Sequence, residues 1–528
     1  MTRRWNGWGD VERHYPLPGS AITYLEKRIG KGTIRPDASL DDVISIIPSS
    51  RLPSHPKILT NAEERLAHAR GQSLPDWISL RYGKIETFPD GVAYPASEED
   101  IQNLVDFAMQ SGVCLIPYGG GTSVVGHINP PLCDKPILTI DLCQMNRLIK
   151  LSEKDHLATF EAGVCGPLLE RQLRNRGYTL GHFPQSFEYS TLGGWIATRS
   201  SGQQSYFYGR IEDLFAGGHV ITPSGLLDLP PYPASAAGPD LRHLILGSEG
   251  RFGILTKATV RVRRIPEVEG FYGVIFPNWE FGISTVRVIA QEKIAVSMLR
   301  LSDPMETEIT LNLSGHEKLL EWAKRCARLF RWGRELCLLI IGITGTRKSF
   351  EQTYNLAMNI AKEHKGILLG SIVGEQWRKT RFATPYLRNT LWENGYAIDT
   401  LETAINWSSV PECALAILKS IDEMEKNILA FSHLSHVYRD GASIYVTYII
   451  PREESPEEML NRWKAIKSAA SQTILSYGGT ISHQHGIGQD HLAYLVQEKS
   501  KIGMEALKRI GEAFDPQGIL NPGTLFPK

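Results

Sequence analysis

The hydrophobic pattern of the chain becomes regular near Gly91. Residues 91–95 predict a strand, and Ser97, with Asp100 three positions later, predicts the start of a helix. The apolar residues of this helix recur at helical spacing and are Ile101, Leu104, Val105 and Ala108. Gly112 predicts its end, and residues 113–117 predict a buried strand that runs into a glycine triplet. Short strands and helices therefore alternate in this region.

The second half of the chain has longer elements. Residues 316–330 and 351–364 predict helices, and residues 337–344 predict a strand between them. Residues 441–448 alternate strictly, which is typical of a strand with one buried face. Two more helices are predicted after residue 455, and Pro516 ends the second. These patterns predict an α+β fold in four parts: an N-terminal extension (1–85), an α+β unit (86–266), an α/β cap or substrate domain (267–450) and a C-terminal segment (451–528).

Composition narrows the functions that this fold could serve. A length of 528 residues favours two to four domains. Lys and Arg number 57, as do Asp and Glu, so no overall field favours nucleic acid, and an anionic ligand must be bound by local charge. Seven cysteines without a C-x-x-C spacing indicate free thiols and a reducing compartment. Because neither a signal peptide nor a membrane-spanning run is present, the sequence predicts a cytoplasmic protein.

Glycine-rich segments are the first candidates for a ligand site. Residues 119–121 are three glycines that follow a buried strand, an arrangement that lets backbone N–H groups point at a diphosphate. Such a triplet alone is as often a tight turn. It matches neither the G-x-G-x-x-G pattern nor a P-loop. Three further segments rich in glycine and hydroxyl residues, 184–194, 198–202 and 247–254, favour the ligand site.

Four of these stretches resemble the FAD-contacting segments of the type-4 FAD-binding oxidase/transferase group, which has the vanillyl-alcohol oxidase and p-cresol methylhydroxylase fold. Within the group, the chain is most similar to the alkyldihydroxyacetonephosphate synthase family, from residues 4–9 through 208–214 to 481–488. Residues 514–523 instead resemble relatives that oxidise hydroxy acids. The resemblance implies that these residues bind FAD: Pro117, Tyr118, Gly119, Gly120, Gly121, Thr122, Ser123, Gln185, Ser186, Phe187, Glu188, Tyr189, Ser190, Thr191, Thr198, Arg199, Ser200, Ser201, Glu249, Gly250, Arg251, Phe252, Gly253, Ile254 and Leu255.

The resemblance also implies a domain plan and a mode of cofactor attachment. Residues 86–266 would form a two-subdomain PCMH-type FAD-binding domain, and residues 451–528 would complete it and the active site. Members that tether flavin through the glycine loop have a histidine where this chain has Thr122, so we expect non-covalent FAD. The alternative is a covalent bond from His127 or from a cysteine.

Candidate catalytic residues lie in the second half of the chain. His483 and His485 are two positions apart, so in an extended segment they would face the same side and could move protons or ligate a metal. A surface pair without chemistry is the alternative. The synthase family has three consecutive histidines here, whereas this chain has Gln484, which cannot take a proton. Tyr445 matches the general acid/base of that family, although a strand tyrosine is otherwise usually part of the core.

Two arginines and a broken motif complete the candidate site. Arg300 is a charge within an apolar strand, which is costly unless it is paired, and the resemblance makes it an active-site residue close to flavin. Arg388 matches a substrate-contacting arginine, and an ordinary salt bridge is as plausible for it. His433 and His436 lie where flavin-dependent 2-hydroxy-acid dehydrogenases have a metal-binding motif, but Arg439 interrupts that motif. We therefore predict no metal, although either histidine could act as a substitute ligand.

The resemblance implies an enzyme of ether lipid synthesis that exchanges the acyl group of acyl-dihydroxyacetone phosphate for a fatty alcohol, with flavin as a nucleophile and no net redox change. One alternative is an FAD-dependent dehydrogenase of a 2-hydroxy acid or glycerol phosphate. Another is a flavin subunit for electron transfer without chemistry of its own. A small or lipid-like substrate is expected. Peripheral contact with a membrane and a homodimer are both compatible with the resemblance, whereas no nucleic-acid partner is expected.

Overall fold

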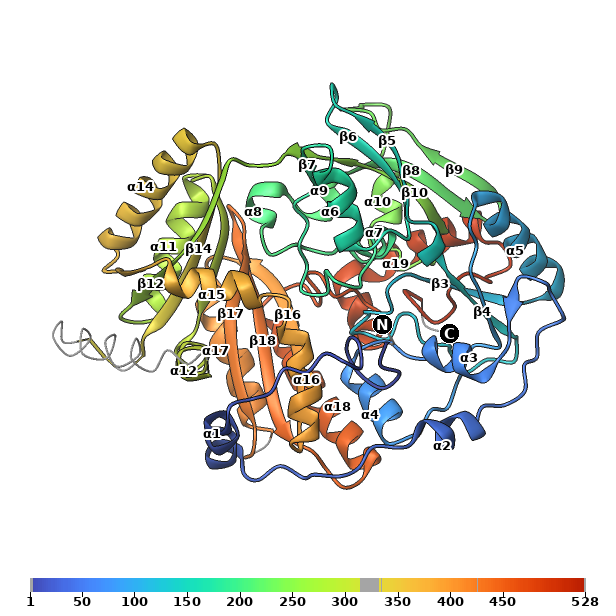
Figure 1. The fold of residues 1–528 in the computed structure, drawn as a ribbon, viewed down its shortest axis with the longest axis horizontal. Helices are drawn as coiled ribbons and strands as arrows, with labels where there is room; N and C mark the ends of the chain where they lie inside the picture. Colours follow the sequence, from blue (N-terminus) through green and yellow to red (C-terminus); the bar gives the residue numbers. More distant parts are fainter. Residues whose placement is uncertain (1–2, 314–331, 334, 425, 527–528) are drawn as a thin grey trace.

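The N-terminal region wraps around the rest of the molecule. The computed structural model describes every residue except 1–2, 314–331, 334, 425 and 527–528. The first elements are α1 (Gly19–Ile29), α2 (Leu40–Ser45), β1 (Ile58–Leu59), α3 (Ala62–Ala67) and α4 (Leu74–Arg81). Figure 1 shows this segment in blue along one edge of the molecule. The Arg3 side chain donates to the carbonyl of Gly120 at 2.5 Å, and the backbone N–H of Trp8 donates to Asn389 Oδ1 at 3.2 Å. The extension therefore contacts both halves of the chain.

Two small sheets form the part that carries the glycine-rich segments. The first has the order β1-β2-β4-β3, and its later strands are β2 (Gly91–Ala93), β3 (Cys114–Tyr118) and β4 (Ile137–Asp141). The second is antiparallel, with the order β5 (Leu148–Ser152), β6 (Leu157–Glu161), β10 (Ile254–Arg261), β8 (Phe215–Thr222) and β9 (Gly225–Leu229). The shorter elements here are α6 (Gly166–Arg174), β7 (Tyr178–Thr179), α7 (Leu192–Thr198), α8 (Ser205–Tyr208), α9 (Ile211–Leu214), α10 (Arg242–Ile245) and β11 (Arg263–Arg264).

The helix predicted after Ser97 is α5 (Glu98–Ser111). The Ser97 side chain accepts the N–H of Asp100, and Gly112 has a φ of +65°, a conformation that glycine adopts without steric cost. The strand predicted at 113–117 is β3. The capping serine and the terminal glycine were therefore sufficient to predict both ends of α5.

A seven-stranded sheet forms the core of the second half. Its order is β15 (Ile367–Gly370), β12 (Val268–Phe276), β14 (Cys337–Gly345), β13 (Val296–Ser302), β17 (Leu429–Val437), β18 (Gly441–Pro451) and β16 (Tyr396–Asn406). One face packs against α11 (Trp279–Gln291), α14 (Arg347–Glu363), α17 (Val410–Asp422) and α18 (Pro456–Ser476). On the other side lie α12 (Pro304–Leu313), α15 (Ile372–Thr380) and α16 (Thr384–Glu393). The strand predicted at 337–344 and the helix predicted at 351–364 are confirmed in β14 and α14, and the helix predicted at 316–330 lies outside the described residues.

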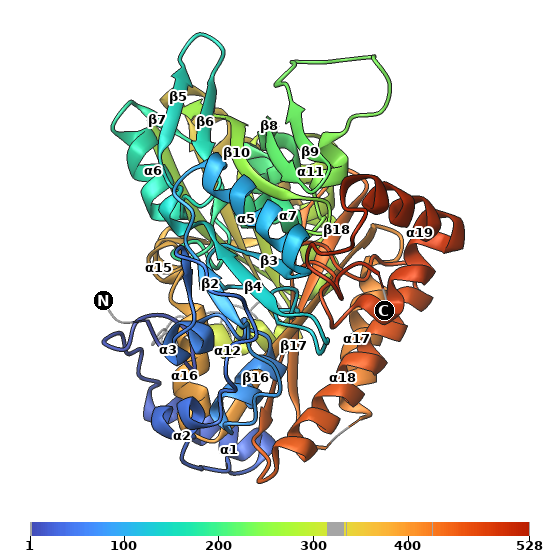
Figure 2. The same cartoon turned by 90° about the vertical axis from the view of Figure 1, so that its right-hand side faces the viewer.

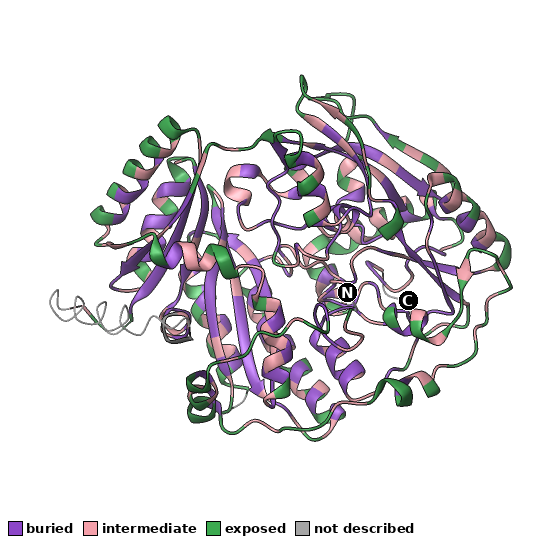
Figure 3. Cartoon of the chain, in the orientation of Figure 1, coloured by how far each residue is buried: buried purple, intermediate pink, exposed green. Residues whose placement is uncertain are grey.

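Side chains along the central strands point alternately to the two faces of the seven-stranded sheet. On β18, Ile444, Val446 and Tyr448 enter the helix-covered core, whereas Tyr445 points to the opposite side. On β13, Leu299 and Leu301 enter the same core, and Arg300 points away from it. Figure 3 shows the strands largely buried, with exposed positions on the outer sides of α14 and α1. The two-residue period thus brings both polar side chains to one face.

The C-terminal segment returns to the first sheet. Figure 2 shows α18 and α19 (Leu495–Phe514) along one side of the molecule. After α19, Leu520 forms a parallel bridge with Leu115, and Asp515 pairs with Arg251 at 3.1 Å. No helix in the described part of the chain is long and apolar enough to span a bilayer. The α+β architecture, with a four-stranded sheet, a five-stranded sheet, the two-stranded pair β7 and β11 and a separate seven-stranded sheet, agrees with the fold predicted from the sequence. The four residue ranges given above remain our proposal for the domains.

Candidate active site

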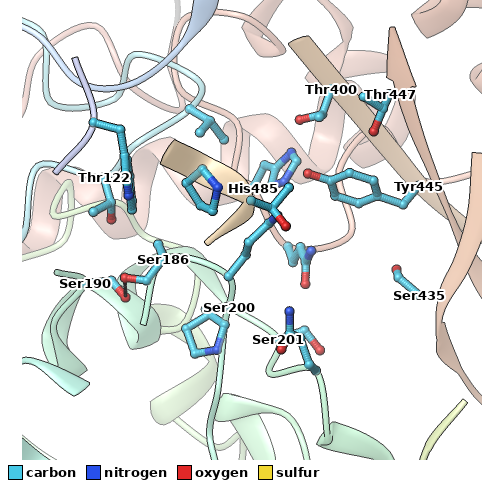
Figure 4. A pocket seen from close by; sticks show the side chains of 18 of the residues that line it. Thr122, Ser186, Ser190, Ser200, Ser201, Thr400, Ser435, Tyr445, Thr447 and His485 are labelled. Atoms are coloured by element: carbon cyan, nitrogen blue, oxygen red, sulfur yellow. Dashed lines mark hydrogen bonds between the residues drawn. The ribbon is translucent and has the colours of Figure 1, made fainter. Parts of the chain in front are cut away.

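A cavity of about 600 Å³ lies between the glycine-rich segments and the seven-stranded sheet. Figure 4 shows Thr122, Ser186 and Ser190 on one side of it and Tyr445 with Thr447 on the other. Of the residues predicted to bind FAD, eighteen line the cavity, from all four segments: Pro117, Tyr118, Gly119, Gly120, Gly121, Thr122, Ser123, Gln185, Ser186, Ser190, Thr191, Thr198, Ser200, Ser201, Glu249, Gly250, Gly253 and Leu255. The structure thus brings the four segments to one place.

Seven predicted residues of these segments do not line the cavity, and their side chains have other partners. Glu188 accepts from Arg13 and Tyr386, Arg199 pairs with Glu212, and Arg251 pairs with Asp515. The other four are Phe187, Tyr189, Phe252 and Ile254. Position within a glycine-rich segment therefore does not decide which side chains face the cavity.

The glycine triplet has two structural roles. The backbone N–H groups of residues 120–124 have no hydrogen-bond acceptor among the described residues, so they are free to bind an anion. A Cβ added at Gly120 would lie 2.0 Å from the carbonyl oxygen of Tyr189. The sequence predicts that the triplet lets backbone N–H groups point at a diphosphate. At Gly120, the missing side chain also serves packing within the protein, because here two of the glycine-rich segments lie backbone to backbone.

Several polar atoms at the cavity have no partner within the described protein. Trp8 Nε1, Gln203 Oε1, Glu306 Oε2, Arg381 Nε and Gln484 Oε1 are buried without a hydrogen bond, and all five residues line the cavity. A buried polar group left in that state costs about 1–3 kcal/mol. A ligand with carbonyl, N–H and phosphate groups, such as FAD with a bound substrate, would satisfy donors and acceptors of both kinds. The free N–H groups and these unpaired atoms together fit a flavin site.

Tyr445 and His485 form the polar wall opposite the glycine loop. Their rings meet edge to face with centroids 5.6 Å apart, and the ring of Tyr445 also stacks on His433 at 5.0 Å. Burial raises the pKa of Tyr445 to about 12. Burial lowers the pKa of His485, although the carboxylate of Glu402 opposes that shift. At neutral pH the tyrosine is therefore a proton donor and the imidazole a proton acceptor.

The loop that carries His485 folds around a buried carboxylate that sequence reasoning missed. Glu402 Oε1 accepts the backbone N–H groups of His483, Gln484 and His485 at 3.2, 2.7 and 2.7 Å. Burial alone would raise the pKa of Glu402, but the two imidazoles and the N–H of Gln484 together hold it well below its usual range. Glu402 lies on β16, about eighty positions earlier in the chain, so no local pattern could have revealed it.

His483 and His485 were expected to face the same side if their segment were extended, and the segment is not extended. The segment bends around Glu402 instead of running as an extended strand. His485 lines the cavity, whereas His483 does not: its Nε2 is hydrogen-bonded to the Tyr438 hydroxyl and its Nδ1 lies 3.5 Å from Glu402 Oε2. His483 therefore supports the loop from behind.

Arg300 is half-buried and pairs with two buried residues, Glu306 and His433. Its Nη2 donates to Glu306 Oε1 at 2.6 Å, and its Nη1 lies 2.8 Å from His433 Nε2. His433 Nδ1 lies 3.0 Å from the same Glu306 oxygen. Burial raises the pKa of Glu306, but Arg300 and His433 overcome that effect and bring it to about 2. Glu306 thus supplies the partner that the charge of Arg300 needs within an apolar strand. Both ring nitrogens of His433 have hydrogen-bond partners, so this histidine is not free to ligate a metal.

Two further candidates, Arg388 and His436, lie near Tyr445 and His485 at the cavity. Arg388 lines the cavity, donates to the carbonyl of Gln72 at 2.6 Å and lies over the ring of Trp77. No carboxylate lies within 4 Å of its guanidinium among the residues described. His436 lies 3.1 Å from the Ser205 hydroxyl, and its ring stacks on His483.

Glu249 links the last glycine-rich segment to the His485 loop. It accepts the N–H groups of Ile487 and Gly488 at 2.5 and 3.0 Å. Its φ is +52°, which is uncommon for a residue other than glycine. Burial raises the pKa of Glu249 to about 7, and the two N–H groups limit the shift. Two carboxylates thus hold the loop, Glu402 from the large sheet and Glu249 from the cofactor side.

Comparisons with known proteins agree with this geometry. Residues 89–228 match the family described as "FAD binding domain", and residues 265–525 match "FAD linked oxidases, C-terminal domain". The chain is 29% identical to alkyldihydroxyacetonephosphate synthase of Dictyostelium discoideum over 99% of this chain and 93% of that protein. A solved structure of an alkyldihydroxyacetonephosphate synthase superposes with a TM-score of 0.84 at 27% identity, covering 98% of both chains. Substrate-bound p-cresol methylhydroxylase superposes with a TM-score of 0.68 at 14% identity over 96% of both chains, a likeness of fold alone.

Proposed function

We propose that this chain, which belongs to the FAD-linked oxidases and is an alkyldihydroxyacetonephosphate synthase-like member of them, exchanges the acyl group of acyl-dihydroxyacetone phosphate for a fatty alcohol. The bond from C1 to the acyl oxygen breaks, the fatty acid leaves, and a bond from C1 to the alcohol oxygen forms. Such an exchange would place the enzyme in ether lipid synthesis and requires no external electron acceptor.

An apolar part of the cavity carries this proposal. One group of its lining residues belongs to a single hydrophobic cluster formed by α1, α16, β17, β18 and neighbouring segments: Leu25, Ile309, Leu391, Leu429, Phe431 and Ile449. Leu17, Tyr24 and Ile398 pack against that cluster and also line the cavity. A long alkyl chain gains about 0.8 kcal/mol for each buried CH₂ group, so it benefits from such a wall. A 2-hydroxy acid or glycerol phosphate has no chain to place there.

The proton transfers can be divided between Tyr445 and His485. Loss of a C1 proton needs a base, and His485 is neutral at physiological pH because burial lowers its pKa. Tyr445 keeps its proton because its pKa is raised to about 12, so it would donate that proton to the departing fatty acid and take one back from the incoming alcohol. Arg300, fixed by Glu306 and His433, offers positive charge to an oxygen anion at the same wall. His483, outside the cavity, would act by supporting the loop.

FAD is the cofactor of this site, and when bound it supplies a nucleophilic nitrogen that permits exchange without net redox change. The N–H groups of residues 120–124 would hold its diphosphate. We propose that the attachment is non-covalent, because Thr122 stands at the tethering position of the glycine loop. His127, the alternative, also lines the cavity, and its Nδ1 is hydrogen-bonded to Ser123 Oγ at 2.9 Å.

An exchange assay in a closed, oxygen-free tube tests the proposal. The purified yellow protein is mixed with palmitoyl-dihydroxyacetone phosphate and hexadecanol, and the products are quantified by mass spectrometry. We expect palmitate and the alkyl ether in equal amounts with no electron acceptor present. No exchange, together with bleaching of the flavin by a hydroxy acid or glycerol phosphate, would replace the synthase with a dehydrogenase. The matched control is Tyr445→Phe, which should keep its flavin and lose exchange.

A further inference from the structure

Arg381 is a cavity-lining arginine that the sequence did not single out. It follows α15 directly and lies among three aromatic rings, with its guanidinium carbon 4.8 Å from the centroids of Phe183 and Phe382 and 5.8 Å from that of Trp377. Rings packed on the guanidinium fix its plane and leave only its edges for hydrogen bonds. The side chain is therefore held in place before any ligand arrives.

One edge of this guanidinium is hydrogen-bonded to the described protein and the other is not. Arg381 Nη1 donates to Gln204 Oε1 at 2.9 Å, and Gln204 Nε2 in turn donates to Glu269 Oε1 at 2.9 Å. Nε is buried without a partner. Nη2 likewise makes no hydrogen bond to the described residues. Nε and Nη2 form the fork that matches two oxygens of a carboxylate or phosphate.

Among the residues that the structure describes, none is a direct counter-ion of Arg381. Within the described ranges, no carboxylate comes within 4 Å of its guanidinium, whereas Arg300 at the same cavity is paired with Glu306. Burial lowers the pKa of Arg381, and Glu269, one residue removed through Gln204, offsets part of that effect. A buried guanidinium stays charged at neutral pH, so an anion that entered the cavity would be attracted to it.

We propose that Arg381 is an oxyanion-binding residue, which uses its Nε and Nη2 to bind a phosphate or carboxylate group of the ligand. The chemical identity of the anion rests on the proposed function, because that reaction has two candidates: the phosphate of the ketone substrate and the carboxylate of the departing fatty acid. The site itself does not depend on turnover. Binding can therefore be measured without the exchange reaction.

The test uses the FAD-loaded protein and two simple anions. Inorganic phosphate and hexanoate are titrated separately into the wild type, Arg381→Gln, Arg381→Lys and Arg378→Gln by calorimetry. Arg378 lies on α15 three positions earlier, is exposed and pairs with Glu375 at 2.8 Å, so it is a matched control. We expect Arg381→Gln to weaken binding of one anion by about tenfold or more, since the loss of hydrogen bonds to a charged group is of that size. Arg381→Lys should weaken it less, and Arg378→Gln should not change it.

The anion that responds identifies the ligand group. A response to phosphate assigns the headgroup of the substrate, and a response to hexanoate assigns the fatty acid. Equal binding in the wild type and both Arg381 variants would overturn the proposal, and so would a wild type that binds neither anion. Loss of FAD affinity alone would also overturn it, because Arg381 would then hold the cofactor. If Arg381→Gln does not fold, Arg381→Lys is compared with the wild type by the same criteria.

Discussion

Glu402 offers a sharp test of how the active-site loop is built. Replacing it by glutamine preserves the shape of the side chain and one acceptor oxygen, but it removes the negative charge that faces the N–H groups of His483, Gln484 and His485. The substitution therefore separates the effect of charge from the effect of packing. Both the stability of the protein and the protonation of His485 should respond.

The expected loss of unfolding free energy follows from the three hydrogen bonds that Glu402 accepts. A hydrogen bond to a charged group contributes about 1.5–3 kcal/mol, and one between neutral groups about 0.5–1.5 kcal/mol. Neutralising the acceptor of three bonds should thus cost about 3 kcal/mol of unfolding free energy. The charge of Glu402 also raises the pKa of His485 against the effect of burial. Without that charge the pKa of His485 should fall further.

Two assays check these effects. Urea unfolding, followed by fluorescence, should show the loss of stability at neutral pH. Because the pKa of Glu402 is depressed in the folded protein, its charge contributes stability above the ordinary glutamate pKa, and the contribution is lost as pH falls through the folded value. Wild type and variant should therefore converge at acidic pH. In the pH profile of kcat/KM, the acid limb of the variant should move to lower pH, since His485 stays neutral to a lower pH.

The control is Glu457→Gln, which removes an exposed carboxylate paired with Lys84. A surface pair of this kind contributes little, so the control should match the wild type in both assays. Glu402→Gln with unchanged stability at neutral pH and an unmoved acid limb would refute the reasoning. The loop would then be held by its backbone and by Glu249 alone.

Further predictions concern the cofactor and the chemistry. Acid denaturation should release all yellow colour into the supernatant because Thr122 cannot tether flavin, and colour retained in the precipitate would contradict this. Gly120→Val should yield protein with little flavin absorbance, since its Cβ would lie 2.0 Å from the carbonyl oxygen of Tyr189; normal occupancy would show that the two loops can separate. Tyr445→Phe should keep its flavin and reduce turnover by about two orders of magnitude or more, and unchanged turnover would return it to a packing role. Gln484→His should retain exchange if the site belongs to a synthase; exchange absent from both variant and wild type, with flavin bleached by a hydroxy acid, would favour the dehydrogenase.

Local sequence signals predicted an element correctly where residues at its own ends mark its start and its end. The helix after Ser97 has a capping serine at one end and Gly112 at the other, and both work as predicted. The alternation of residues 441–448 predicted a strand with one buried face, and the structure confirms it, with Tyr448 in the core and Tyr445 at the cavity. The glycine-rich segments were visible because each is contiguous in sequence, and their resemblance to the FAD-contacting segments of a known family implied what they bind.

The sequence by itself therefore predicted the α+β plan, the positions of the glycine-rich segments and the alternation of residues 441–448. Only the tertiary structure decided which charges meet: Glu402 with the His485 loop, Glu306 with Arg300 and His433, and the unpaired edge of Arg381 at the cavity. The physical reason is that capping, turns and strand alternation act over a few neighbouring residues. A buried charge instead needs a partner in space, and strand pairing and packing bring that partner from anywhere in the chain.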